Sequence, residues 1–371
     1  MHDGLALMIV NSVYQLFSAV HIRRCILGEK KAELLLTDLL PGVKDYGERV
    51  EKTGLFERVL FAKTAGLCKQ YVTGDRKEIE EGYAKSKSIL RWILSDELGS
   101  YDEIYFSNFD TFTRMLASQM YEEAPAFICY EDGFSTYVID YLREERAAVN
   151  QTEAGTKIRE LVKRVMLYEP RLAMRGDHFP NGRIPRVSIK DEGLKELLNY
   201  IFAYQRGDMW ENFIFLEQSF RAEGIKSNDI ALMEACQSAV LPGNFIVKPH
   251  PRNQKNLPFE LGLSRKYDSR IPWELFLMNE PAGRFHLITV CSNAALTGRI
   301  VFGMDMDTVM LYRLFEGRVL WKEDEVLMRY LQKFYRQFAG ENYYVPKTAY
   351  ELKNILQYLS DTKSQEAADG R

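Results

Sequence analysis

The segment Lys248-Pro249-His250-Pro251-Arg252 has the residue types and spacing best suited to chemistry. It follows the apolar run 244–248, and in α/β sheets the turn after a strand lies where ligands bind. The two prolines fix the backbone beside His250 and so restrict the direction of its imidazole ring. Lys248 and Arg252 suit a phosphate, and without an anion they lower the pKa of the imidazole. We predict that His250 gains a proton together with an anionic ligand; a proline-braced surface turn is the plainer alternative.

Two adjacent carboxylates, Glu131 and Asp132, follow a second apolar run at 125–130. Neighbouring carboxylates repel, so the pKa of one of them is raised and that group could serve as a general base. Gly133 permits a turn that other residues resist. The alternative is structural, because Asp132 could simply cap the helix that follows.

Three other segments share the pattern of a strand followed by a polar turn or a helix start. Ser292 and Asn293 precede a helical stretch whose backbone N–H groups would bind an anion. Glu274 lies in the first turn of a helix that a proline opens, which by itself is ordinary helix-start chemistry. Glu223 lies in the polar segment after the apolar run 212–217 and is expected at the same edge of the sheet.

Common catalytic motifs are missing from the sequence, which contains no GxGxxG, GxxxxGK[ST], GxSxG or HExxH pattern. The triplet Asp305-Met306-Asp307 could bind a metal, but we interpret it as a solvated loop and predict no metal site. The five cysteines are scattered without a CxxC pair, which argues against a disulfide framework or a zinc site.

Strand-like and helix-like stretches alternate along most of the chain, which predicts an α/β fold with doubly wound parallel sheets. Strands are expected at 5–10, 33–37, 57–62, 103–107, 125–130, 212–217, 244–248, 284–290 and 300–303. Helices are expected from residue 13 and at 45–53, 75–97, 110–122, 135–146, 157–167, 190–205, 228–239, 272–279, 293–298, 322–338 and 347–360.

The length of 371 residues favours two domains. We expect an N-terminal Rossmann-like domain at 1–155, a helical linker at 156–210, a C-terminal Rossmann-like domain at 211–345, and a C-terminal helix and tail at 346–371. Two such domains facing a central cleft form a GT-B-type arrangement. The net charge of −3 argues against bulk nucleic-acid binding. With no apolar run of about 18 residues and no signal-like start, we expect a cytoplasmic protein.

Taken together, these motifs resemble the bacterial sialyltransferases, especially glycosyltransferase family 52, which makes lipooligosaccharide and capsule sialosides. The order and spacing carry the resemblance: Glu274 lies 24 residues after His250, and Ser292 lies 18 residues after Glu274. The matched segments are Ser12-Val13-Tyr14-Gln15-Leu16, Glu131-Asp132-Gly133, His250-Pro251, and Ser292 in the phosphate motif.

The resemblance implies an inverting transfer of sialic acid from CMP-sialic acid to a saccharide hydroxyl, with no metal or other cofactor. Lys248 and Glu274 would hold the cytosine beside Pro249, and Ser292 with Asn293 would hold the phosphate. His250 would protonate or hydrogen-bond the leaving phosphate as the general acid.

The general base stays open among Asp132, Glu131 and Glu223, because the loop at 218–220 departs from the family pattern. Asn293 also replaces a second serine of the phosphate motif, and its side chain can still donate a hydrogen bond.

Other interpretations stay open. The chain could be a different GT-B enzyme, such as a Kdo or other nonulosonic-acid transferase or a nucleotide-sugar epimerase. It could also be a non-catalytic relative that binds a nucleotide or a glycan. The resemblance allows a homodimer. A lipid-linked acceptor would bring the protein to the inner face of the plasma membrane, where the basic helix expected at 157–166 could make a peripheral contact.

Overall fold

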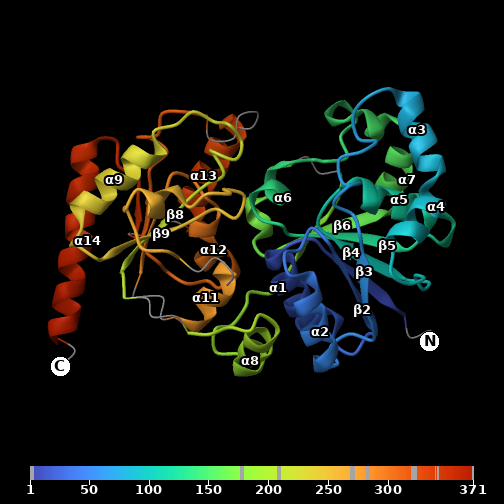
Figure 1. The fold of residues 1–371 in the computed structure, drawn as a ribbon, viewed down its shortest axis with the longest axis horizontal. Helices are drawn as coiled ribbons and strands as arrows, with labels where there is room; N and C mark the ends of the chain where they lie inside the picture. The colour runs from blue at the N-terminus through green and yellow to red at the C-terminus, as the bar shows by residue number, and fades with distance from the viewer. Residues whose placement is uncertain are drawn as a thin grey trace. The chain divides into compact units, whose positions relative to one another are not determined.

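The structure, a computed structural model, describes residues 4–175, 179–206, 210–267, 272–280, 285–318, 324–338, 340 and 342–369. The chain divides into two compact units. Unit 1 comprises Met1–Val187 and Asp191–Tyr204, and unit 2 comprises Ser188–Lys190 and Gln205–Arg371. Each unit is an α/β structure built on its own parallel sheet (Figure 1).

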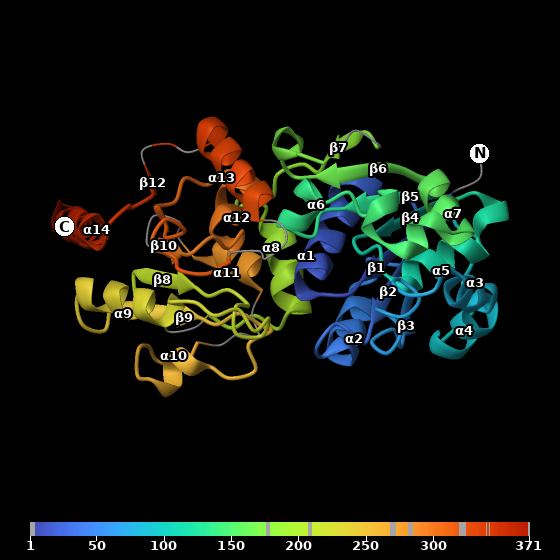
Figure 2. The same cartoon turned by 90° about the horizontal axis from the view of Figure 1, so that it is seen from above.

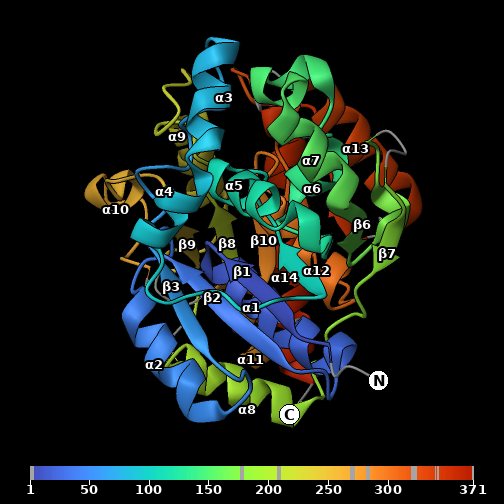
Figure 3. The same ribbon diagram turned by 90° about the vertical axis from the view of Figure 1, so that its right-hand side faces the viewer.

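Unit 1 contains a parallel sheet whose described strands run in the order β3-β2-β1-β4-β5-β6-β7 (Figure 3). The apolar runs predicted as strands lie at its centre, and β1 is buried along its whole length, as expected for a strand covered on both faces. The strands are β1 (Ala6–Val10), β2 (Ala32–Thr37), β3 (Val59–Ala62), β4 (Glu103–Phe106), β5 (Ala126–Tyr130), β6 (Val162–Leu167) and β7 (Asn181–Arg183).

Helices cover both faces of this sheet (Figure 1). One layer consists of α1 (Val13–Ile22), which continues as a π-helix (Arg23–Leu27), together with α2 (Val43–Thr53) and α8 (Glu192–Ile201). The other consists of α3 (Arg76–Ala84), α4 (Ser86–Ile93), α5 (Thr111–Gln119) and α7 (Glu153–Leu161). The short helix α6 (Phe134–Val138) follows β5, and 3-10 turns lie at Tyr121–Glu123, Glu144–Arg146, Ala148–Gln151 and Pro170–Leu172.

The segment predicted as a helical linker differs most from expectation. Helix α7 ends at Leu161, and β6 then pairs in parallel with β5 on one side and with β7 on the other, with Val162 and residues 165–167 buried. Residues 156–187 and 191–204 therefore lie within unit 1. The cations of the expected membrane-facing helix have internal partners: Lys157 pairs with Glu153, and Arg159 donates to backbone carbonyls.

Unit 2 contains a parallel sheet whose described strands run in the order β12-β11-β10-β8-β9, so β8 lies between β10 and β9 (Figure 2). Its strands are β8 (Phe213–Leu216), β9 (Phe245–Lys248), β10 (His286–Thr289), β11 (Thr308–Met310) and β12 (Tyr343–Tyr344). Its helices are α9 (Asp229–Ala239), α10 (Leu257–Glu260), α11 (Trp273–Asn279), α12 (Ala294–Val301), α13 (Asp324–Phe338) and α14 (Ala349–Asp369), of which α14 packs against α9 (Figure 1).

Two further predicted elements are wrong in type or extent. The apolar run at 300–303 is not a strand but contains the buried end of α12, and the strand comes later as β11. A short apolar run does not distinguish a strand from a buried helix end. The helix expected at 135–146 ends at Val138 and gives way to turns. Among the described helices, none is both long enough and apolar enough to cross a membrane.

Candidate functional site

A row of polar side chains follows the carboxyl edge of the unit 1 sheet, where its strands end. Asn108, after β4, accepts from Asn11 Nδ2 at 2.9 Å and from Gln15 Nε2 at 2.7 Å. Its own Nδ2 reaches Asp132 Oδ2 at 3.5 Å. Thr37, the last residue of β2, donates to Asn11 Oδ1 at 2.7 Å. Because the strand order reverses between β1 and β4, this row lies at the topological switch point, where open α/β sheets bind ligands.

Glu131 is buried within a set of hydrogen-bond donors. Tyr14 of α1 donates to its Oε1 at 3.1 Å, the Tyr137 hydroxyl donates to its Oε2, and the Tyr168 N–H donates to Oε2 at 2.9 Å. Burial is the main cause that raises the pKa of Glu131 to about 7, and these donors act in the opposite direction. The side chain is 1% exposed, so its oxygens serve neighbouring residues rather than a ligand.

Asp132 is the more accessible of the two adjacent carboxylates. Its N–H donates to Thr136 Oγ1 at 2.9 Å, which fixes the turn after β5. Gly133 supplies φ 77° and ψ −152°, a backbone conformation that other residues resist, and it is the N-cap residue of α6. The N-cap residue of α6 is Gly133 rather than Asp132, and it has no side chain to cap the helix.

In unit 2, the buried carboxylate of Glu217 holds the loop that carries His250. Glu217 follows β8, and its Oε2 accepts from the His250 N–H at 2.9 Å and from Asn253 Nδ2 at 2.7 Å. Its Oε1 accepts from Arg221, which also pairs with Asp229 at 3.2 Å. Spacing along the sequence did not reveal that Glu217 fixes the His250 loop.

The ring of His250 has a defined hydrogen-bond geometry. Its Nδ1 accepts from the Arg252 N–H at 3.2 Å, so the neutral ring carries its proton on Nε2. Burial, together with the charges of Arg252 and Lys248, lowers the pKa of His250 to about 4, and Glu223 acts in the opposite direction. Near neutral pH the ring is therefore an Nε2–H donor with basic flanks. Full protonation would also break the Arg252 contact, so this geometry favours hydrogen-bond donation over proton transfer.

Lys248 and Glu274 form a charged pair that is not in direct contact. Burial raises the pKa of Glu274 to about 7, and the nearby charge of Lys248 lowers it. Burial lowers the pKa of Lys248, and Glu274 and Glu217 raise it. No ion pair within 4 Å joins the two side chains in the described part of the chain, and the Lys248 ammonium lies 5.8 Å from the centre of the Tyr267 ring. Pro249, between Lys248 and His250, is buried.

The helix start at Ser292 and Asn293 offers fewer donors than the sequence suggested. The Ser292 N–H donates to Thr289 Oγ1 at 3.1 Å, and the Ala294 N–H donates to Ser292 Oγ at 3.3 Å. The Ala295 N–H closes a turn on the Ser292 carbonyl. Tyr330 of α13 donates to Asn293 Oδ1 at 3.2 Å, which leaves the Asn293 amide nitrogen without an acceptor among the described residues. The Ser292 hydroxyl, the Asn293 side-chain amide and the Asn293 N–H are thus the groups left for an anion.

Glu223 lies on the same face of unit 2 as the His250 loop. Its Oε1 accepts from Ser219 Oγ at 2.5 Å and pairs with Arg252 at 3.1 Å. A hollow of about 440 Å³ beside this loop is lined by Arg221, Arg252, Asn253 and Lys255 among others, and its cationic lining suits an anion.

Both carboxylates of the triplet Asp305-Met306-Asp307 have protein partners. Asp305 pairs with Arg299 at 2.6 Å, and Asp307 contacts His286 Nδ1 at 2.7 Å. No group of three or more His, Cys, Asp or Glu side chains with the geometry of a metal site occurs in the described ranges.

Comparison with known proteins gives matches in structure only. No protein-family model matches the chain, and no curated protein sequence matches it significantly. The UDP-GlcNAc 2-epimerase of Methanocaldococcus jannaschii is 10% identical, with a TM-score of 0.51, over 96% of this chain and 92% of that one. UGT89C1 of Arabidopsis thaliana is 12% identical, with a TM-score of 0.51, over 96% of this chain and 93% of that one. An α/β-galactoside α-2,3-sialyltransferase of Photobacterium phosphoreum is 10% identical, with a TM-score of 0.48, over 93% of this chain and 99% of that one.

At these identities the similarity concerns the fold. Two parallel α/β units that match such structures over nearly the whole chain confirm the predicted fold class. The chain has a two-domain, Rossmann-like GT-B fold.

Proposed function

We propose that this protein is an inverting, metal-independent glycosyltransferase that moves sialic acid from CMP-sialic acid to a saccharide hydroxyl, as in glycosyltransferase family 52. The observation that carries the proposal is the His250 loop. A buried glutamate fixes its backbone, its ring is held as an Nε2–H donor, and Lys248 and Arg252 lie beside it. A donor held among cations suits a phosphate that becomes more negative as its bond to the sugar breaks.

Lys248 and Glu274 supply the recognition of cytosine. Cytosine has an exocyclic amino donor and ring acceptors, and a carboxylate commonly accepts from that amino group. Glu274 would accept from the amino group, and Lys248 would donate to the carbonyl oxygen of the base. Since no direct ion pair joins these two side chains in the described residues, each retains a group to offer to the base.

In the reaction, the bond between the anomeric carbon and the phosphate oxygen breaks while the acceptor oxygen forms the new bond on the opposite face of the sugar. His250 Nε2–H stabilises the departing phosphate by hydrogen bonding, and Ser292 and Asn293 bind its other oxygens. Asp132 takes the proton of the acceptor hydroxyl. Glu131 orients the turn that carries Asp132, and Glu223 holds Arg252. No covalent intermediate is needed, because a single displacement inverts the anomeric centre.

Variants of the carboxylates and of His250 test this assignment. We expect Asp132→Asn and His250→Ala each to lower kcat by about 100-fold or more. Glu223→Gln is the matched control for Asp132→Asn, because it removes the carboxylate charge of another candidate base. It should lower kcat less than Asp132→Asn does. The measurement is transfer from CMP-sialic acid to lactose, followed by the mass of the product. The assignment is wrong if Glu223→Gln abolishes transfer while Asp132→Asn retains it.

A comparison of CMP with UMP separates this proposal from an enzyme that uses UDP-sugars, such as an epimerase of the same fold. The two nucleotides differ only in the base, so Glu274 should discriminate between them through the amino group. We expect CMP to raise the melting temperature more than UMP at equal concentration, and Glu274→Gln to reduce that difference. Preferential stabilisation by UMP or UDP would favour the epimerase alternative.

A further inference from the structure

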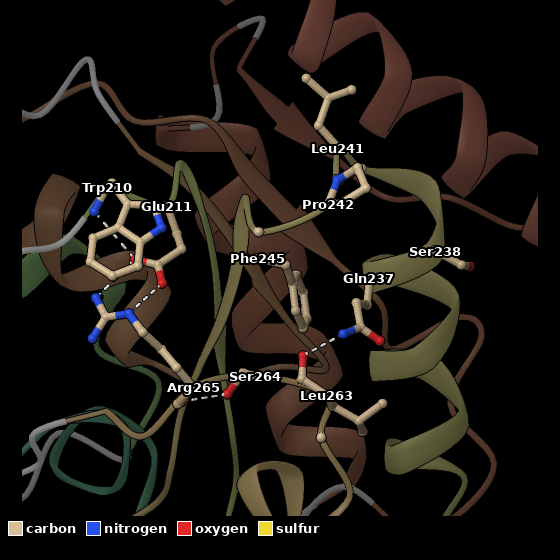
Figure 4. A pocket seen from close by; sticks show the side chains of 13 residues that line it. Trp210, Glu211, Gln237, Ser238, Leu241, Pro242, Phe245, Leu263, Ser264 and Arg265 are labelled. Carbon is tan, nitrogen blue, oxygen red and sulfur yellow. Dashed lines mark hydrogen bonds and ion pairs between the residues drawn. The ribbon is translucent and has the colours of Figure 1, made fainter.

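A second pocket lies at the opposite, amino edge of the unit 2 sheet (Figure 4). It has a volume of about 480 Å³ and is lined by residues that precede β8, end α9, begin β9 and lie at 262–265. Phe245, the first residue of β9, lies in its wall, whereas Lys248 and His250 follow the other end of the same strand. The pocket is therefore separate from the candidate donor site.

An exposed tryptophan is fixed at the rim of this pocket. The guanidinium of Arg265 lies 4.3 Å from the centre of the Trp210 ring. Arg265 also makes two hydrogen bonds to buried Glu211, at 2.5 Å and 3.0 Å. Figure 4 shows these three side chains together on one side of the pocket. Trp210 is nevertheless 58% exposed, so much of an indole with a restricted orientation is open to a ligand.

The lining of the pocket is mostly apolar, with a few polar side chains and no net charge. Glu211 and Arg265, the charged residues of the lining, neutralise each other. Gln237 Nε2 donates to the Leu263 carbonyl at 2.8 Å, which directs that amide and leaves its oxygen as an acceptor (Figure 4). An uncharged ligand with many hydroxyl donors and an apolar face matches this lining.

We propose that this pocket binds a saccharide of several sugar residues, of which one packs its C–H face on Trp210 and another reaches Gln237 on the opposite side of the pocket (Figure 4). This inference rests on the proposed function and extends it: the pocket holds sugar residues of a long acceptor that are distant from the reacting galactose. The four residues of β9 separate the two sites, about 13 Å of strand at 3.3 Å per residue. Because the two sites lie at opposite ends of this strand, a disaccharide at the donor site does not extend to the pocket, and the proposal requires a longer acceptor.

The test compares lactose with lacto-N-neotetraose, a tetrasaccharide that also ends in galactose, as acceptors for the full-length protein. We expect KM for the tetrasaccharide to be lower than KM for lactose by about threefold to tenfold, the usual value of one aromatic contact. Trp210→Ala should remove this difference without changing kcat or the KM for lactose. Trp210→Phe should retain most of it, because a ring remains.

Two further variants and a binding measurement complete the design. Gln237→Ala removes the amide that extends into the pocket and should also reduce the difference, which covers the case in which Trp210→Ala folds poorly. Trp92→Ala is the matched control, because Trp92 is an exposed tryptophan of unit 1, 84% exposed. Calorimetry with lacto-N-neotetraose in the absence of donor measures binding without turnover.

The outcomes separate the two proposals. Trp210-dependent binding with no transfer to either acceptor supports the saccharide pocket and contradicts the proposed function. Transfer with equal KM for the two acceptors, unchanged by Trp210→Ala, overturns the saccharide pocket and leaves the transferase intact. Equal effects of Trp92→Ala and Trp210→Ala also overturn it, since the effect would not belong to the pocket.

Discussion

The buried carboxyl of Glu131 should make the stability of unit 1 depend on pH in a defined direction. Its pKa is ordinarily 4.5 and is raised to about 7 in the folded protein, mainly by burial. The folded state therefore keeps a proton that the unfolded chain releases above pH 4.5. Stability from this group is fully present below pH 4.5 and is lost as the pH rises through 7. Each unit of pKa difference is worth about 1.4 kcal/mol, so the loss amounts to about 3 kcal/mol.

Glu131→Gln tests this value, because glutamine has nearly the same shape and does not ionise. The Tyr14 hydroxyl, which can rotate, would accept from the new amide, while the remaining oxygen still accepts from Tyr137 and the Tyr168 N–H. The measurement is urea unfolding of both proteins from pH 4.5 to 8. The difference in free energy of unfolding should move by about 3 kcal/mol in favour of the variant over this range.

Parallel curves, with a difference that changes by less than about 0.5 kcal/mol, would refute the reasoning. Glu97→Gln, which replaces an exposed carboxylate of the same unit, gives the background effect of the substitution.

Three other perturbations follow from the contacts. Glu217→Gln removes the charge that Arg221 pairs with and weakens the acceptor of the His250 loop, so it should destabilise unit 2 by about 3 kcal/mol, measured by thermal unfolding. Lys248→Met should weaken CMP binding about tenfold or more, measured by calorimetry, because it removes a charged donor to the base. Burial lowers the pKa of His21 from 6.5 to about 4. The stability that unit 1 gains by keeping this ring neutral is therefore fully present above pH 6.5 and is lost as the pH falls toward 4. His21→Gln should remove this pH-dependent loss of about 3 kcal/mol, measured by urea unfolding.

Much of the fold could be predicted from local patterns. Continuous apolar runs such as 6–10 and 126–130 form the central strands, and polar residues directly after them lie at the carboxyl edge as expected. Where a local pattern was ambiguous, pairing within the sheet determined whether a segment formed a strand or a helix. Residues 162–167 form a strand because β5 offers a free edge to pair with, which no periodicity within the segment reveals.

The candidate site was predictable in position but not in its supporting contacts. Tyr14 reaches Glu131 across 117 residues of sequence, and Glu217 reaches the His250 N–H across 33. Such partners are set by the topology of the sheet rather than by spacing. The helix start at Ser292 shows the reverse: its spacing suggested free N–H groups, but the Thr289 hydroxyl at the end of β10 already accepts one of them.

One measurement tests the proposed function most directly: release of CMP from CMP-sialic acid by the purified protein, with and without lactose, in the presence of EDTA. We expect lactose to stimulate CMP release, EDTA to leave the rate unchanged, and mass spectrometry to show a sialylated product. No CMP release under any of these conditions, together with no effect of CMP on the melting temperature, would contradict the proposal that the His250 loop binds a CMP-sugar.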